Sequence, residues 1–146
     1  MTALEPAGPD LLERLAAALG PDALRPPEPR YLEEPRGRFS GQAAAVLLPR
    51  TTAEVAEAVR LCAAARVGLV PYAGGTGLVG GQLATAGPIP LVLSFERMTR
   101  IRDLDLVDAV LIAEAGCILA DVQAATRATF ASGSRRCSPT ARSSRG

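Results

Sequence analysis

One glycine-rich stretch, residues 71–81, carries the residues that could do chemistry, and it reads PYAGGTGLVGG. Five of its last eight residues are glycine, and Thr76 lies among them. Glycine tolerates positive φ and lets the backbone approach a ligand closely. Successive N–H groups turned inward form a nest for an anion. The stretch is interpreted as a cradle for a phosphate or pyrophosphate, with a flexible loop between two strands as the alternative.

This stretch differs from two common phosphate-binding motifs. A Walker A loop needs a Lys, and the sequence contains none. Gly75–Gly80 matches the dinucleotide pattern G-x-G-x-x-G, and Glu96 follows at the expected distance of about 20 residues. A Rossmann site also needs the motif to open a helix, but residues 82–90 are short and rich in Pro and Gly. An NAD-binding Rossmann module is therefore the weaker alternative.

Missing residue types exclude several kinds of site. The sequence has no His, which excludes His-based acid–base catalysis, His–metal ligation and a Ser-His-Asp triad within it. Cys62, Cys117 and Cys137 have no metal-ligand spacing, so no metal site is expected and the first two are predicted to be core thiols. The absence of Lys and Asn, with Arg as every basic residue, suggests a bacterial genome of high GC content.

The formal net charge of +1 combines two different parts. Residues 1–121 carry 11 Arg against 15 Asp or Glu, whereas residues 122–146 carry 5 Arg and no acid. This balance predicts no nucleic-acid partner. No apolar stretch approaches the roughly 18 residues of a spanning helix, and the N-terminus lacks the pattern of a secretory signal. A cytoplasmic protein without a membrane span is expected, and its oligomeric state stays open.

Apolar spacing predicts the elements that position the glycine stretch. Before it we expect a helix over 10–19 capped by Asp10, a strand over 43–48, a helix over 51–66 with a capping box, and a strand over 67–72. After it we expect a strand over 91–95, a hairpin of 101–107 and 109–113, and a helix over 118–128. The Pro-rich residues 21–41 are predicted to form a connector without regular structure. The first strand–helix–strand unit should form a right-handed parallel crossover.

The pattern Pro71-x-x-Gly74-Gly75-Thr76-Gly77-Leu78-x-Gly80-Gly81 resembles the pyrophosphate loop of the PCMH-type FAD-binding domain, found in vanillyl-alcohol oxidase and p-cresol methylhydroxylase. The closest branch is the FAD-linked oxidase family of D-lactate, glycolate and D-2-hydroxyglutarate dehydrogenases. Four further segments resemble that family in the same order: residues 31–41, 45–55, 91–101 and 114–119. The resemblance covers roughly residues 10–128.

The resemblance implies FAD as the cofactor and assigns roles to individual residues. Gly74, Gly75, Thr76 and Gly77 would bind the pyrophosphate, mainly through backbone N–H groups. Leu78, Gly80 and Gly81 would shape the flavin side of the loop, and Pro49 and Pro71 would lie near the adenosine end. Ser94 and Met98 would line the flavin, and Gly116 would let the backbone pass close to it. For Ser94, Met98 and Gly116, a plain packing or turn role is an equal alternative.

The resulting prediction is an α+β fold of the PCMH type, with an N-terminal α/β subdomain and the start of a second, incomplete one. Residues 1–41 would form the helix and connector, 42–128 part of the FAD-binding domain, and 129–146 a disordered Arg/Ser-rich tail. The tail is interpreted as out-of-frame translation, with binding to an acidic partner as the alternative.

The predicted function is the FAD-binding portion of an oxidoreductase in which a small 2-hydroxy acid passes a hydride to flavin N5. The chain supplies no identifiable catalytic residue and is expected to be truncated and inactive alone. The alternative is a non-catalytic fragment with little or no FAD binding.

Overall fold

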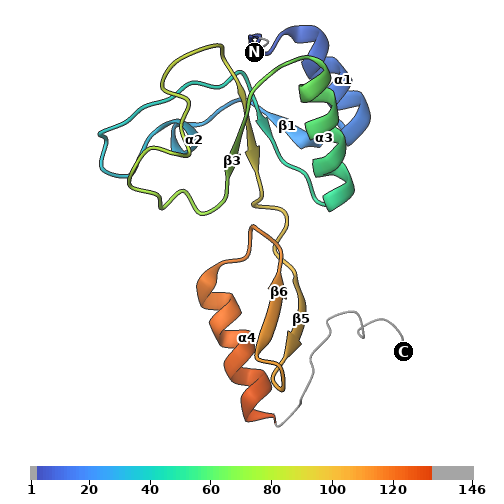
Figure 1. The fold of residues 1–146 in the computed structure, drawn as a ribbon, viewed down its shortest axis with the longest axis vertical. Helices are drawn as coiled ribbons and strands as arrows, with labels where there is room; N and C mark the ends of the chain where they lie inside the picture. Colours follow the sequence, from blue (N-terminus) through green and yellow to red (C-terminus); the bar gives the residue numbers. More distant parts are fainter. Residues whose placement is uncertain (1–2, 133–146) are drawn as a thin grey trace. The chain divides into compact units, whose positions relative to one another are not determined.

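The computed structural model describes residues 3–132 and divides them into two compact units (Figure 1). The first unit ends at Arg97 and the second begins at Met98. Among residues 3–132, no helix has both the length and the apolar character needed to cross a bilayer.

A four-stranded sheet forms the centre of the first unit. Its strands are β1 (Leu24–Arg25), β2 (Val46–Leu47), β4 (Leu91–Ser94) and β3 (Leu69–Tyr72), in that spatial order. Both β2 and β3 run parallel to β4, and β1 pairs antiparallel with β2. The predicted parallel relation of β2 and β3 is confirmed, but β4 lies between them. Because parallel strands end at the same edge, the segments that follow β3 and β4 leave the sheet together.

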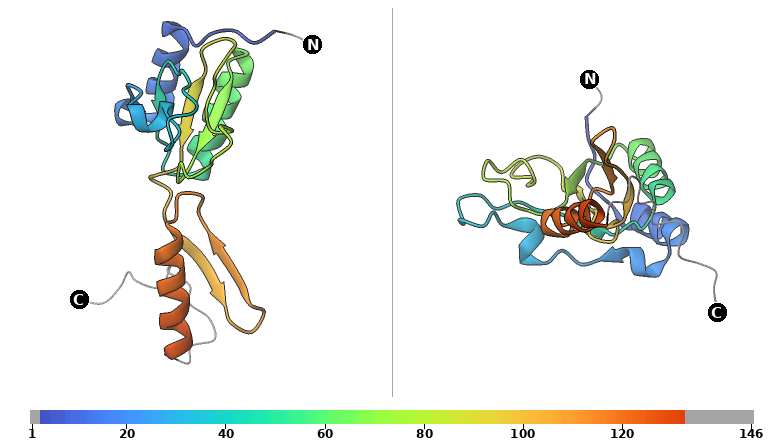
Figure 2. Two further views of the ribbon diagram at one scale, coloured as in Figure 1. Left: turned by 90° about the vertical axis from the view of Figure 1, so that its left-hand side faces the viewer. Right: turned by 90° about the horizontal axis from the view of Figure 1, so that it is seen from below.

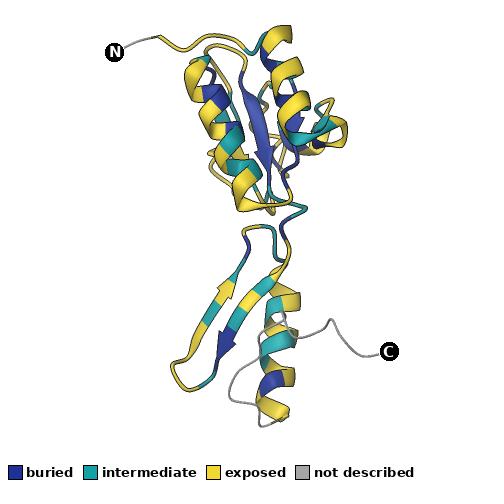
Figure 3. Ribbon diagram, turned by 90° about the vertical axis from the view of Figure 1, so that its right-hand side faces the viewer, coloured by how far each residue is buried: buried dark blue, intermediate teal, exposed yellow. Residues whose placement is uncertain are grey.

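Two helices cover one face of this sheet: α1 (Pro9–Leu19) and α3 (Thr52–Ala64) (Figures 1 and 2). Side chains alternate between the two faces along a strand. Leu47 therefore joins Leu15 and Leu61 in the core under the helices, whereas its neighbours Val46 and Leu48 belong to a smaller cluster with Tyr31 and Val92. In Figure 3 a strand of this sheet is dark blue along its length, the colour of buried residues, as expected for β4, in which every residue is buried.

Two expectations about the N-terminal region are wrong. Helix α1 begins at Pro9 after Gly8, so Asp10 lies in its first turn and does not cap it. Proline is well suited to the first helical position, because the N–H it lacks would have no partner there. Residues 21–41 are also regular in part. They contain the 3-10 turn η1 (Pro21–Ala23), β1 and the short helix α2 (Pro29–Leu32).

The second unit consists of a hairpin with a helix alongside it (Figures 1 and 2). The antiparallel strands β5 (Ile101–Asp105) and β6 (Val110–Ala113) confirm the predicted hairpin. Its turn is held by the Asp105 carboxylate, which accepts hydrogen bonds from the N–H groups of Val107 and Asp108.

Helix α4 (Leu119–Ala131) continues past residue 128, where the tail was expected to begin. The Thr129 side chain is buried. Its hydroxyl has a hydrogen-bond partner within the same helix, because it donates to the Ala125 carbonyl. The expectation of disorder is therefore wrong for residues 129–131. The rest of the predicted tail, residues 133–146, lies outside the described residues.

Candidate cofactor site

The glycine loop, residues 73–82, begins where β3 ends and does not open a helix. The Rossmann requirement is therefore not met. Gly75 and Gly80 have φ values of +65° and +72°, which L side chains rarely adopt. Within residues 3–132, the backbone N–H groups of Gly74, Gly75, Thr76 and Gly77 have no hydrogen-bond partner. Four consecutive free donors in a loop without side-chain bulk suit the oxygens of a pyrophosphate.

Tyr72, the last residue of β3, lies directly against Gly75. A Cβ atom built on Gly75 would overlap the Tyr72 hydroxyl and lie 2.7 Å from the ring carbon that bears it. The hydroxyl is held in place because it donates to the Arg30 carbonyl at 2.8 Å. The Tyr72 side chain therefore packs against the loop at Gly75, and only glycine fits at position 75.

Gln82 closes the loop on itself. Its amide nitrogen donates to the carbonyls of Gly75 and Gly77, at 3.1 and 3.2 Å. A Cβ on Gly77 would overlap the Gln82 side-chain oxygen. With these carbonyls already bonded to Gln82, the loop is fixed in a compact form in which its N–H groups are available to a ligand.

A hollow of about 490 Å³ lies beside the start of the glycine loop. It is lined by Pro29, Arg30, Glu33, Glu34, Pro35, Gly37, Tyr72, Gly74, Gly75 and Thr76. Three of the predicted pyrophosphate residues thus line one concave surface together with the segment around α2. A hollow of this volume is in the range that small-molecule and cofactor sites occupy.

A polar cluster around the buried Tyr31 lies at the wall of this region, and the sequence did not predict it. The Tyr31 hydroxyl donates to Glu96 at 2.7 Å and accepts from Arg30 at 2.6 Å. Arg30 also pairs with Glu96 at 3.3 Å, and the rings of Tyr31 and Tyr72 meet edge to face at 5.0 Å. Burial, followed by the bond to Glu96, raises the pKa of Tyr31 to about 12. Glu96, which lies at the distance expected after a G-x-G-x-x-G pattern, bonds to these two side chains.

The remaining predicted residues of the first unit lie around the loop or beneath it. Leu78 is half-exposed, and Gly81 is exposed with open space where a Cβ would stand. Pro71 is exposed on β3, in register with Leu93 of β4. Ser94 is fully buried at the end of β4.

Met98 and Gly116 form a separate group in the second unit. The Gly116 N–H donates to the Met98 carbonyl at 2.9 Å, and the Met98 side chain is buried. Glu114 fixes this arrangement, because it accepts from the Arg100 N–H at 2.9 Å and pairs with the guanidinium groups of Arg100 and Arg102. The predicted site residues thus fall into two groups, one in each unit.

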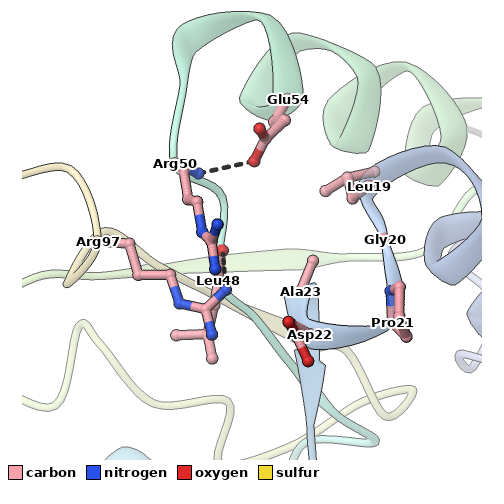
Figure 4. Close-up of a pocket in the computed structure, with 9 residues that line it drawn as sticks. All are labelled: Leu19, Gly20, Pro21, Asp22, Ala23, Leu48, Arg50, Glu54 and Arg97. Atoms are coloured by element: carbon pink, nitrogen blue, oxygen red, sulfur yellow. Dashed lines mark hydrogen bonds between the residues drawn. The ribbon is translucent and has the colours of Figure 1, made fainter.

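A second hollow of the first unit, of about 200 Å³, contains none of the predicted cofactor-binding residues. Figure 4 shows Arg50 and Arg97 side by side at Leu48, whose carbonyl accepts a long 3.5 Å bond from Arg97. Asp22 and Glu54 also line it, so its charges balance and it does not favour an anion.

Among residues 3–132, no group of three or more His, Cys, Asp or Glu is arranged to hold a metal ion. Cys62 is buried as predicted, and burial raises the pKa of its thiol; Cys117 is half-buried.

Residues 43–138 match the FAD binding domain family, which is more than half of the chain. The chain belongs to this family of FAD-binding domains. The match continues past residue 128, where the sequence resemblance was expected to end. Relatives of this FAD-binding domain include a probable mitochondrial D-2-hydroxyglutarate dehydrogenase of Oryza sativa subsp. indica. It is 37% identical over 83 residues, which cover 57% of this chain and 14% of the relative.

A second relative is glycolate oxidase subunit GlcD of Bacillus subtilis, which is 32% identical over 63% of this chain and 19% of its own length. The domain thus spans less than a fifth of these curated relatives. Solved structures confirm the α+β fold of the PCMH type. Alkyldihydroxyacetonephosphate synthase matches with a TM-score of 0.73 at 17% identity, over 88% of this chain and 26% of that chain. p-Cresol methylhydroxylase with substrate bound matches with a TM-score of 0.64 at 14% identity, over 88% and 27%.

Proposed function

We propose that this chain binds FAD through the glycine loop, as the cofactor-binding part of a flavin-dependent oxidoreductase acting on 2-hydroxy acids. The observation that carries the proposal is the run of four free N–H donors at Gly74, Gly75, Thr76 and Gly77, in a member of the FAD-binding domain family. These donors would hold the pyrophosphate, with the Thr76 hydroxyl as an additional donor.

The other predicted residues take roles around this centre. Leu78, Gly80 and Gly81 would shape the flavin side of the loop, and Pro49 and Pro71 would lie near the adenosine. Ser94, Met98 and Gly116 are proposed to line the cofactor as a secondary set. Their burial or half-burial is equally compatible with packing, so they are the weaker part of the proposed site.

The substrate class is proposed from the relatives, which are named as D-2-hydroxyglutarate dehydrogenases and a glycolate oxidase subunit. When bound, the flavin supplies the hydride-accepting chemistry. This sequence contains no His and no residue that we assign to activating the hydroxyl proton. We therefore propose that the chain provides cofactor binding and not substrate activation, and that it is inactive alone.

A thermal-shift titration tests the proposal on the full chain. FAD should raise the melting temperature, because a ligand that binds only the folded state stabilises it. NADH at the same concentration should leave the melting temperature unchanged. A rise in melting temperature with NADH but not with FAD would favour a Rossmann-type NAD site. No rise with either ligand would favour a non-catalytic fragment that does not bind FAD.

We also propose that this chain comes from a bacterium, because it has no Lys or Asn, and that it is cytoplasmic, because Cys62 and Cys117 are free thiols. Several relatives are named as mitochondrial, so fractionation of the native host is the measurement that decides the location.

A further inference from the structure

A second loop, residues 33–42, lies along the glycine loop and is here called the bracing loop (Figure 1). Just after the glycine loop, the Ala84 carbonyl accepts a hydrogen bond from the Gln42 N–H at 3.0 Å, so the end of the bracing loop is joined to the residues that follow the glycine loop. In the middle, the Phe39 ring lies against Gly80, where an added Cβ would stand only 3.3 Å from the ring. The glycine loop is therefore enclosed on one side by a segment about 40 positions earlier in the chain.

Arg36 makes the polar link between these two loops. Its Nε donates to the Glu34 carboxylate at 2.7 Å, and its Nη2 donates to the carbonyl of Leu78 in the glycine loop. The guanidinium is a rigid planar fork that can bond in two directions at once, which a Lys ammonium on a flexible stem cannot do as well.

The anchor of Arg36 is itself fixed. The Glu34 side chain has no exposed surface, and its second oxygen accepts from the Arg38 N–H at 3.2 Å. The backbone of Glu34 bonds to Phe39 and Gly37. The hydrogen bond from Arg36 holds the pKa of Glu34 below its usual range, so the carboxylate is charged at neutral pH. A buried charge of this kind depends on its partners, because losing one leaves it uncompensated.

We propose that Arg36, anchored on Glu34, is a positioning residue that fixes the glycine loop in its binding form before the cofactor arrives. The inference rests on the proposed function, since it concerns the loop that would hold the pyrophosphate. Preorganisation raises affinity because the entropy of ordering the loop is lost before binding. Arg36 acts through Leu78 and needs no contact with the cofactor.

Hydrogen exchange on the full chain without cofactor tests the positioning role of Arg36 directly. In Arg36→Gln and Arg36→Lys, the amides of Leu83 and Gln42, which donate to the carbonyls of Gly80 and Ala84, should exchange roughly tenfold faster than in the wild type, since both changes remove the two-way bond. Exchange in α3 and β4 should not change, which shows that the variants fold. Arg38→Gln is the matched control, because it removes a guanidinium of the same loop that bonds to no other described residue. It should leave the exchange as in the wild type.

FAD titration of the same proteins separates the inference from the proposed function. Both Arg36 variants should raise the FAD Kd about tenfold, and Arg38→Gln should not. If Arg36→Lys matches the wild type in exchange and affinity, a positive charge at position 36 is sufficient, and the proposed role of the two-way guanidinium bond is wrong. Unchanged exchange in Arg36→Gln overturns the inference whatever FAD does. If the wild type does not bind FAD although the Arg36 variants loosen the loop, the proposed function fails, and with it any role of Arg36 in cofactor binding.

Discussion

At the scale of single residues, Gly75 shows why the loop depends on glycine. Its φ of +65° disfavours any L side chain, at a cost of roughly 1–2 kcal/mol. An added Cβ would also overlap Tyr72, whose hydroxyl is held by the Arg30 carbonyl. We predict that Gly75→Ala displaces the loop and abolishes most of the FAD-induced rise in melting temperature.

Gly68→Ala is the matched control for this substitution. Gly68 does not have a positive φ, and an added Cβ would meet Pro90 at an ordinary 3.5 Å. The control should keep the full FAD effect on melting. An equal FAD effect in Gly75→Ala would show that the cofactor does not depend on this loop.

Tyr31 gives a pH dependence at the same scale. Burial, then its bond to Glu96, raises the pKa of the folded-state phenol to about 12, whereas an unfolded tyrosine titrates near 10. The fold thus prefers the neutral phenol. Its contribution to stability is complete below about pH 10 and is lost as the pH rises through about 12.

Denaturant unfolding between pH 9 and roughly 12 measures this effect, and the free energy of unfolding should fall with pH over the upper part of that range. In Tyr31→Phe the free energy of unfolding should not show this fall at high pH. At neutral pH the variant should be less stable than the wild type, because Glu96 and Arg30 lose a hydrogen-bond partner. A fall of the same size in Tyr31→Phe would assign it to other groups.

At the scale of elements, the sequence predicted best what local contacts determine. The capping box of α3 forms as expected, with the Thr51 hydroxyl accepting from the Glu54 N–H at 3.1 Å. The glycine motif was also recognisable, because its residues are adjacent in the chain. The Pro-rich segment was wrongly predicted, since what orders it is distant in sequence. Tyr31 packs with Val46 and Val92, and its hydroxyl donates to Glu96, 65 positions later.

The same reason explains which parts of the site were missed. Tyr72 and Gln82 stand beside the motif, but their support of the loop depends on its folded path. Arg36 reaches Leu78 only because two loops far apart in sequence lie together. No pattern of spacing marks such contacts, although the resemblance did include the segment from Tyr31 to Gly41.

Glu114 provides a prediction for the hairpin as an element. Its buried carboxylate accepts from the Arg100 N–H and pairs with two guanidinium groups at 3.2 Å. The bond from the Arg100 backbone, aided by both side chains, lowers the pKa of Glu114. Its contribution is therefore present above the usual carboxyl pKa and is lost as the pH falls through the lower, folded value. Glu114→Gln should speed amide exchange in β5 and β6 at neutral pH. At acid pH, where the carboxyl of the wild type is also uncharged, the difference in exchange between the variant and the wild type should be smaller.

The control for this variant is Asp108→Asn, an exposed acid in the turn of the same hairpin. It removes the same unit of charge from the hairpin but leaves the bonds of Glu114 intact. If the two variants loosen the hairpin equally, net charge and not the buried carboxylate stabilises it.

At the scale of the whole molecule, the sign of the charge changes near the end of the described residues. Residues 1–132 carry 12 Arg against 15 acids, and residues 133–146 carry 4 Arg and no acid. The last buried residue of the described chain is Thr129, and α4 ends at Ala131. We predict that a chain ending at Ser132 keeps its melting temperature and its FAD-induced shift, while its isoelectric point falls well below 7.7.

A chain ending at residue 138 is the informative comparison, because the family match extends that far. If the fold ends with α4, the two shortened chains should melt together with the full chain, and FAD should raise all three melting temperatures equally. If the FAD effect is lost at 132 and retained at 138, residues 133–138 take part in cofactor binding. The basic residues that cancel the acidic charge of the domain would then belong partly to its site, and a phosphate-bearing ligand gives a physical reason for them to be positive.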